Sequence, residues 1–306
     1  DSLGSVSFKD DPDSYDRGFL HCDLLIIGAG PAGLAGALVA AKSGAEVILA
    51  DEDFNMGGRL NSERFSLNNQ SGVDWAESKV LELQSFQNVR LMPRTTILGA
   101  FDHGKYGALE RVSDHLLVPL TGKPRQILWQ IYTKRSLLCA GATERPIAFQ
   151  NNDRPGVMLA GAMRSYANRW AVTPSQSVAI FTNNDDGHKT AIDLKALGVN
   201  IAGVVDIRPD APESDLYEVI AGGQVIDTNG RLGLTSITVS TPNGKTRALT
   251  CGALGVSGGW NPNIQLTSHH RGRPVWNDDI AAFCPPIDGP VGLSVAGAAL
   301  GSFTTT

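Results

Sequence analysis

Residues 24–33 read Leu-Leu-Ile-Ile-Gly-Ala-Gly-Pro-Ala-Gly, an apolar run that leads into a glycine loop and then into an alanine-rich stretch. This order predicts a strand, a tight turn and a helix. Gly28 would allow the turn, Gly30 would let the backbone approach a pyrophosphate, and Gly33 would let the helix pack on the strand. The unpaired N–H groups at the start of such a helix attract an anion. The stretch therefore predicts a dinucleotide-binding loop.

The segment after this loop completes the expected unit. Residues 34–42 are predicted to form the helix, and residues 46–50 the next strand, which ends at Asp51 and Glu52. An acid about 20 residues past the loop can accept hydrogen bonds from the adenosine ribose. Negative charge on Asp51, Glu52 and Asp53 would repel a 2′-phosphate and so disfavours NADP. NAD and FAD share the same ADP half, so the loop alone does not separate them, and a purely structural turn is the alternative.

The composition is that of a globular chain with room for two domains. It has 306 residues, 42% of them hydrophobic, and a formal net charge of −5. The charged residues are scattered, so we expect no nucleic-acid partner and no membrane partner. No apolar run reaches the length of about 18 residues typical of a membrane span, and the polar, acidic start is unlike a secretory signal. We therefore expect a cytoplasmic protein.

The cysteines and histidines predict no metal site. Four cysteines are spread along the chain, at Cys22, Cys139, Cys251 and Cys284. Because none forms a CxxC pair, we expect buried thiols rather than zinc ligands or a redox dithiol. His269 and His270 are adjacent, so on a strand their side chains would face opposite ways, and no acidic or cysteine partner stands nearby.

The rest of the first unit mixes ligand-binding and structural signals. In the loop Met-Gly-Gly-Arg-Leu at residues 56–60, Gly58 would permit close approach to a ligand and Arg59 could meet a phosphate, although an ordinary turn with a solvated arginine is the alternative. Residues 73–86 are expected to form an amphipathic helix. Further strands are expected at residues 90–101, 108–112 and 126–132, which would form an antiparallel meander. A buried strand is expected at residues 136–142, and its glycine turn, with Ala140 and Gly141, would lie beside the first glycine loop.

A second nucleotide-type unit begins near residue 177. A strand at 177–181, a helix at 188–197 and a strand at 201–205 repeat the first pattern, but the loop between the first two reads Thr-Asn-Asn-Asp-Asp-Gly. Its side chains would crowd a pyrophosphate and its carboxylates would repel it. We therefore expect a scaffold without a dinucleotide of its own. Three further strands are expected, at residues 223–227, 233–240 and 246–251.

Together these elements predict an α/β fold with two Rossmann-like dinucleotide-binding domains of the glutathione-reductase type, the second inserted in the first, and with an antiparallel β-meander. The expected boundaries are an N-terminal extension at residues 1–21, a discontinuous first domain at 22–147 and 250–306, and the inserted domain at 148–249. The extension lacks periodicity, so we expect a tether or a segment that lies along another body.

Several stretches of this sequence resemble the alpha subunits of heterotetrameric sarcosine oxidase. The most specific are Arg-Pro-Gly-Val-Met at residues 154–158 and Gly-Gly-Trp-Asn-Pro at residues 258–262. Others lie at residues 23–53, 57–60, 99–104, 109–112, 141–146, 152–161 and 181–185, so the resemblance covers most of residues 12–303.

The resemblance implies that this chain holds NAD while the amine is oxidised at FAD in a partner beta subunit, with FMN also elsewhere in the hetero-oligomer. It implies Gly30 and Ala32 at the pyrophosphate, Asp51 and Glu52 at the ribose, and Arg59 near a phosphate or ribose. Many FAD proteins of this fold carry a terminal Gly-Asp pair, whereas Ala298 follows Gly297 here, which favours NAD. The full set of candidate cofactor-binding residues is Gly28, Gly30, Pro31, Ala32, Gly33, Asp51, Glu52, Asp53, Gly58, Arg59, Leu60, Ala140, Gly141, Gly297, Ala298, Phe303 and Thr304.

The chain departs from this family in length, since family members carry a ferredoxin-like segment ahead of this region and a folate-binding domain behind it. We expect a fragment, a split subunit or a shortened relative, and we assign no folate chemistry to it. The leading hypothesis is an NAD-binding module, either non-catalytic or supporting electron transfer, of a multi-subunit amine oxidase that acts on sarcosine or a similar N-methyl amino acid. The alternatives are an FAD-dependent oxidoreductase subunit of the opine-oxidase or pyridine-nucleotide-reductase kind, and an assembly scaffold with a structural nucleotide. No catalytic residue is predicted, because His103 is as well explained as a turn histidine.

Overall fold

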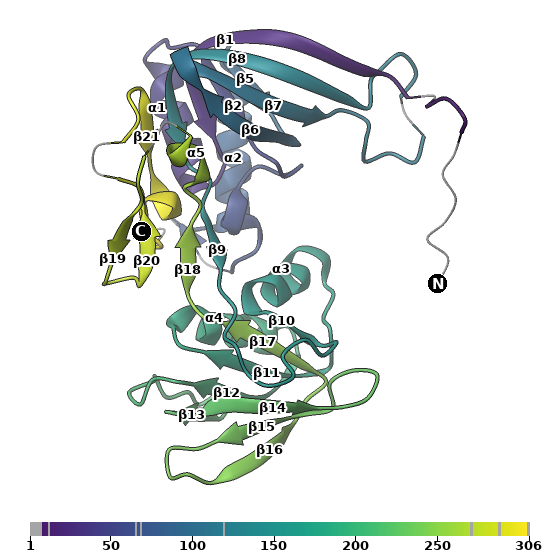
Figure 1. Cartoon of the computed structure of the whole chain (residues 1–306), viewed down its shortest axis with the longest axis vertical. Helices are drawn as coiled ribbons and strands as arrows, with labels where there is room; N and C mark the ends of the chain where they lie inside the picture. The colour runs from purple at the N-terminus through teal and green to yellow at the C-terminus, as the bar shows by residue number, and fades with distance from the viewer. Residues whose placement is uncertain are drawn as a thin grey trace.

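The computed structural model describes residues 8–11, 13–64, 66–67, 69–118, 120–269, 272–286 and 289–304. Two sheets, each packed against helices, form two domains, one at the top and one at the bottom of Figure 1. Extended segments of the chain run between them. The predicted α/β fold with two Rossmann-like domains is confirmed.

The glycine loop follows the end of β1, a central strand of the first sheet. Its strand order is β5-β2-β1-β8-β7-β6, and β21 pairs with the end of β8. The bounds are β1 Tyr15–Ile27, β2 Val47–Ala50, β5 Val89–Met92, β6 Thr95–Phe101, β7 Lys105–Arg111, β8 Gln126–Leu138 and β21 Leu293–Val295. Strands β5, β2, β1 and β8 run parallel, whereas β6, β7 and β8 form the expected antiparallel meander. Every residue of β2 is buried, as is usual for a parallel strand covered on both faces.

Helix α1 (Pro31–Lys42) begins directly at the glycine loop. Gly30 is its N-cap residue and Pro31 its first residue, a position where the missing N–H of proline has no cost. Leu34 and Ala37 of this helix pack with Leu49 in one core cluster, which holds the start of α1 against the sheet. Helix α2 (Gly72–Gln84) contributes to the same cluster. Between them lie η1 (Gly58–Asn61), β3 (Ser66–Leu67) and β4 (Gln70–Ser71).

The second sheet is entirely parallel, with the order β10-β17-β11-β12-β13. The bounds are β10 Val157–Leu159, β11 Ser177–Thr182, β12 Asn200–Asp206, β13 Val219–Ala221 and β17 Ala253–Ser257. Helices α3 (Ala160–Trp170) and α4 (Asp185–Ala196) share one core cluster with this sheet. A small antiparallel sheet of β14 (Gln224–Asn229), β15 (Ser236–Ser240) and β16 (Thr246–Thr250) packs in a second core cluster with its strands. The parallel sheet is therefore buried between two layers.

Two extended segments link the domains. Strand β9 (Ala142–Glu144) leads out of the first domain and pairs antiparallel with β18 (Trp260–Pro262), which leads back (Figure 1). The remaining elements are η2 (Asp102–Gly104), α5 (Gln265–Ser268), β19 (Val275–Asn277), β20 (Ala282–Cys284) and η3 (Gly297–Leu300). Every helix in the described ranges is too short or too polar to cross a membrane.

Three expectations about strands are corrected. Residues 15–21 are not a tether, because they form the first half of β1 and pair with residues 126–132 of β8. The strands expected at 126–132 and 136–142 are joined as far as Leu138 in one continuous strand, β8, and Ala142 already belongs to the next strand, β9. The strand expected at 90–101 is two strands, β5 and β6, because Arg94 adopts a positive φ of 56° after Pro93 and turns the chain.

The expected return to the first domain at residue 250 is wrong. Strand β17 lies between β10 and β11 in the second sheet, where its five residues are all buried. An apolar strand of this kind fits either parallel sheet, so its residue types do not assign it. The chain returns to the first domain only with β18, and β21 then joins the first sheet beside β8.

Candidate dinucleotide-binding site

A cavity of about 1510 Å³ opens where β1 ends and α1 begins, and residues of both domains line it. Its size exceeds the range of about 300–1,000 Å³ that is usual for small-molecule pockets. Of the candidate residues, those that line it are Gly28, Gly30, Pro31, Ala32, Asp51, Glu52, Asp53, Gly58, Arg59, Ala140, Gly141, Gly297, Ala298, Phe303 and Thr304. Fifteen positions chosen from sequence are thus brought together around one cavity.

The three glycines of the loop have different surroundings. A Cβ at Gly30 would meet no atom within 4 Å, so this backbone faces open space at the cavity. A Cβ at Gly33 would instead overlap the carbonyl oxygen of Gly28, and Gly28 itself has a φ of 99°. Gly30 therefore leaves room for a ligand, whereas Gly28 and Gly33 are required by the fold of the loop.

The first turn of α1 supplies donors next to this open space. The first N–H groups of any helix have no partner within the helix, and the helix dipole places partial positive charge there. Ala32 in this turn lines the cavity, as does Pro31, which itself has no N–H to donate. This combination suits an anionic group such as a pyrophosphate.

Asp51 follows the end of β2 and hydrogen-bonds both to the glycine loop and to the turn after β2. Its Oδ2 accepts the N–H of Ala29 at 2.5 Å, and its Oδ1 accepts the N–H of Asp53 at 2.8 Å. Burial, with smaller contributions from the charges of Asp53 and Glu52, raises the pKa of Asp51 above its usual value. A carboxylate has about four lone-pair positions, so Asp51 retains acceptors for ribose hydroxyls.

The neighbouring acids differ in their surroundings. Asp53 is held by both terminal nitrogens of Arg169, at 2.8 and 3.2 Å, and Arg169 belongs to α3 of the second domain. Burial would raise the pKa of Asp53, but the hydrogen bonds from Arg169 outweigh it and the pKa is lowered. Glu52 is exposed at the cavity rim, and its carbonyl oxygen accepts a hydrogen bond from Arg111 at 2.6 Å.

Arg59 lies at the cavity wall but is already engaged by carboxylates. Its Nη2 lies 2.9 Å from Asp186 of the second domain, its Nε pairs with Glu63, and its guanidinium stacks 4.1 Å from the ring centre of Trp260. The solvated-arginine alternative is thus excluded. A phosphate would have to share this guanidinium with the two acids.

Two candidate residues lie behind the cavity rather than in its wall. Leu60 is buried in the first core cluster, because the side chain of this 3₁₀ turn points toward α1 and α2. Gly33 is covered by the glycine loop itself. Both therefore support the site without facing it.

Sequence reasoning missed part of the lining. The missed residues include Thr95, Thr96, Ile97 and Leu98 of β6, Trp75, Asn263, Gln265, Leu266 and His269, and Arg164, Asp186, Lys189, Ile192 and Asp193 of the second domain. No spacing in the sequence relates these segments to the glycine loop. The Nδ1 of His269 accepts the N–H of Ala100 at 3.1 Å, while His270 lies outside the described residues.

The four cysteines are free thiols, and three of them are buried. Cys139 lines the cavity, where burial raises the pKa of its thiol to about 12. A thiol with such a pKa is protonated at neutral pH and is a poor nucleophile.

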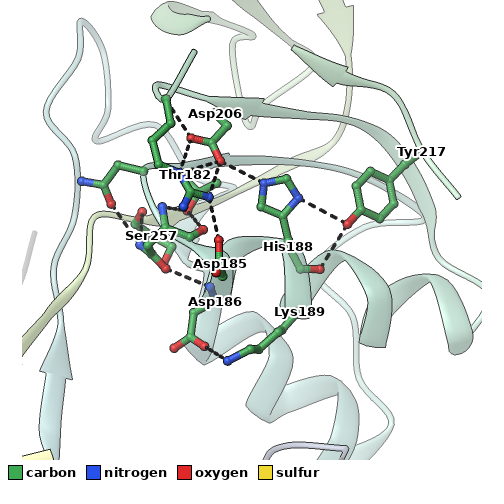
Figure 2. A network of polar contacts seen from close by, with 11 residues as sticks. Thr182, Asp185, Asp186, His188, Lys189, Asp206, Tyr217 and Ser257 are labelled. Atoms are coloured by element: carbon green, nitrogen blue, oxygen red, sulfur yellow. Dashed lines mark hydrogen bonds and ion pairs between the residues drawn. The ribbon is translucent and has the colours of Figure 1, made fainter. Parts of the chain in front are cut away.

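In the second domain, a network of polar side chains surrounds Asp206 at the end of β12 (Figure 2). Asp206 is fully buried, and its Oδ2 lies 2.9 Å from His188 Nε2 and 2.8 Å from Arg208 Nη2. Arg208 also reaches Asp185 at 2.8 Å. Asp206 stands where the first domain has Asp51, but its oxygens are occupied by side chains of its own domain.

Replacing Asp206 by asparagine should lower the free energy of unfolding by about 2 kcal/mol at neutral pH. Burial favours the neutral acid, but the hydrogen bonds from His188 and Arg208 outweigh it and lower the pKa of Asp206 from 3.8 to about 2. A lowered pKa stabilises the fold above about pH 4, and this contribution is lost as the pH falls toward about 2. Urea unfolding across this range should show the difference between wild type and variant shrinking.

Asp185→Asn provides the matched control for this network. Asp185 contacts the same arginine, but its side chain is 70% exposed, so its ion pair should contribute less than about 1 kcal/mol. A pH-independent difference between wild type and Asp206→Asn would contradict the assigned network.

Comparison with known proteins agrees with this geometry. Residues 23–77 match the family model described as FAD dependent oxidoreductase. The chain is 43% identical over 299 residues to the protein named sarcosine oxidase subunit alpha from Rhizobium meliloti (strain 1021), an alignment that covers 97% of this chain and 30% of that protein. The chain thus spans about a third of the length of this relative.

Two solved structures show the same fold. L-proline dehydrogenase from P. horikoshii aligns with a TM-score of 0.72 at 23% identity, over 96% of this chain and 53% of that one. Thioredoxin reductase from Lactococcus lactis aligns with a TM-score of 0.68 at 15% identity, over 91% of this chain and 90% of that one. The chain therefore has an FAD/NAD-binding oxidoreductase fold, and over nearly its whole length it is related in sequence to part of the sarcosine oxidase alpha subunit.

Proposed function

We propose that this chain binds NAD at the cavity, with the ADP half lying between the glycine loop and Asp51. The observation that carries the proposal is the pairing of open backbone at Gly30 with a partly buried carboxylate, that of Asp51, at the end of β2. The first turn of α1 would receive the pyrophosphate, and the free lone pairs of Asp51 would receive the ribose hydroxyls. The open space at Gly30 supports this placement of the ADP group.

The choice of NAD rests on charge and on the closing segment. Glu52 is exposed at the cavity rim and would repel the 2′-phosphate of NADP. In many FAD proteins of this fold, a carboxylate after the corresponding glycine binds the ribityl chain of the flavin. Here Ala298 follows Gly297 in the segment that lines the cavity, and the missing carboxylate favours NAD. FAD is the alternative ligand, favoured by the family description that residues 23–77 match.

We further propose that the chain acts as one subunit of a multi-subunit oxidoreductase that acts on sarcosine or a similar N-methyl amino acid. The sequence relationship to a protein named as a subunit of sarcosine oxidase supports this. The amine would be oxidised at FAD in a partner beta subunit, and this chain would not be catalytic alone. The four cysteines are free thiols, as is usual in a reducing compartment. We therefore propose that the protein is located in the cytoplasm.

The ligand released from the purified wild-type chain tests the proposal. We expect a colourless protein that releases NAD on denaturation, identified by mass spectrometry, or that binds added NAD when purified empty. Copurifying chains weighed in the same experiment would identify the partners. A yellow protein that releases FAD would replace NAD by the flavin alternative. A chain that takes up neither nucleotide would overturn the proposed binding site.

A further inference from the structure

Helix α4 of the second domain forms part of the wall of the first domain's cavity. Its residues Asp186, Lys189 and Ile192 line that cavity together with the glycine loop. In an ordinary two-domain dinucleotide protein, the corresponding helix begins a second nucleotide site. Here its first turn carries two acids and faces the site of the other domain.

The contact lies on the phosphate side of the cavity. A Cβ on Gly58 would be 2.9 Å from the Cα of Gly30, so η1 packs directly against the residue that leaves room for a pyrophosphate. Arg59 follows Gly58 in the chain, and its partner across the domains is Asp186. Asp51 would bind the ribose, the part of the ADP group next to the pyrophosphate.

Asp186 holds a cation on each of its oxygens. Its Oδ2 lies 2.9 Å from Arg59 Nη2, and its Oδ1 lies 3.1 Å from Lys189 Nζ, a contact drawn in Figure 2. Burial would raise the pKa of Asp186, but the charges of Arg59 and Lys189 outweigh it and lower that pKa, which keeps the carboxylate ionised.

Lys189 retains donors after this contact. Its side chain is 59% exposed, and the ammonium has three N–H donors, of which Asp186 takes one. Arg59, with five N–H donors, is shared between Asp186 and Glu63. Because these acids offset the positive charge, an anion would be bound through short charge-assisted hydrogen bonds rather than through a net positive field.

We propose that Arg59 and Lys189, tethered by Asp186, clamp the pyrophosphate of the bound dinucleotide from both domains. This inference rests on the proposed function, because it names further residues of the same site. It also explains the acidic loop of the second domain: Asp186 positions two cations at the site of the first domain. Lys189 is thereby a binding residue, and Asp186 is a positioning residue.

Lys189→Ala tests the clamp in the full chain. Isothermal titration calorimetry at low salt should show about tenfold weaker binding of NAD and of ADP, since one charge-assisted hydrogen bond to phosphate is lost. Binding of adenosine, which has no phosphate, should change by less than about twofold. Lys189→Arg keeps the charge and should restore most of the affinity.

Lys195→Ala is the matched control. Lys195 is an exposed lysine on the same helix and is not among the residues that line the cavity. If Lys189→Ala binds NAD and ADP as Lys195→Ala does, or if it weakens adenosine equally, the clamp is overturned while the proposed function stands. A wild-type chain that binds neither NAD nor ADP overturns both.

Discussion

Gly30→Ala should weaken dinucleotide binding about 100-fold while leaving the protein folded. The backbone of Gly30 has φ −69° and ψ −175°, an extended conformation open to any residue, and a Cβ there would meet no protein atom within 4 Å. The added methyl group would instead occupy the space next to the first turn of α1, where the pyrophosphate approaches. Loss of one or two charge-assisted hydrogen bonds accounts for a change of this size. Calorimetric titration with NAD measures it.

Gly33→Ala adds the same methyl group three residues later. It should act mainly on the stability of the fold, whereas Gly30→Ala should act mainly on ligand binding. Its Cβ would overlap the carbonyl oxygen of Gly28, so the turn between β1 and α1 would have to open. We expect a loss of about 3 kcal/mol in the free energy of unfolding, as is typical of overpacking in a core. Gly30→Ala should cost only about 1 kcal/mol, through a poorer N-cap. Equal thermal stability of the two variants would contradict the assigned roles.

Asp51→Ala is expected to weaken NAD binding about 100-fold. The substitution removes the acceptors proposed for the ribose, and it also removes the hydrogen bonds that join the loop at Ala29 to the turn at Asp53. Titration with NAD and with adenosine should show the same loss, because both ligands carry the ribose. This separates Asp51 from Lys189, whose replacement should spare adenosine.

The pH dependence gives a second readout for Asp51. Its pKa is raised by burial, so its carboxylate becomes protonated at a higher pH than an ordinary aspartate. NAD affinity should therefore fall as the pH is lowered from neutral, and Asp51→Asn should lack this dependence. Glu52→Gln serves as the control, since Glu52 is exposed at the rim and its replacement should change affinity by less than about fivefold. Unchanged affinity in Asp51→Ala would overturn the assigned site.

Local patterns predicted both βαβ units well. The apolar run before Gly28 and the helix after it correspond to β1 and α1, and the strand that ends at Asp51 corresponds to β2. In the second domain, the predicted strand and helix correspond to β11 and α4 within a few residues. These elements are set by contacts between near neighbours in the chain, which periodicity reports directly.

Elements that depend on distant partners were not predicted. The first half of β1 includes exposed side chains such as Tyr15 and Phe19, and it is held as a strand by pairing with β8, more than 100 residues away in the sequence. Helix α3 was missed, and β17 was assigned to the wrong sheet. Their residue types fit several environments, so burial against distant segments decides where they lie.

By itself, the sequence determined the glycine loop, its helix and the acid that follows, because Gly28 and Gly33 are required by the local geometry of the turn and the acid ends an apolar strand. Only the tertiary structure decided that the second domain completes the same cavity. Arg59 and Asp186 are 127 residues apart and meet across the domain boundary. An ion pair of this kind forms only when the two folded domains bring its charges together. The spacing of residues along the chain does not predict that contact.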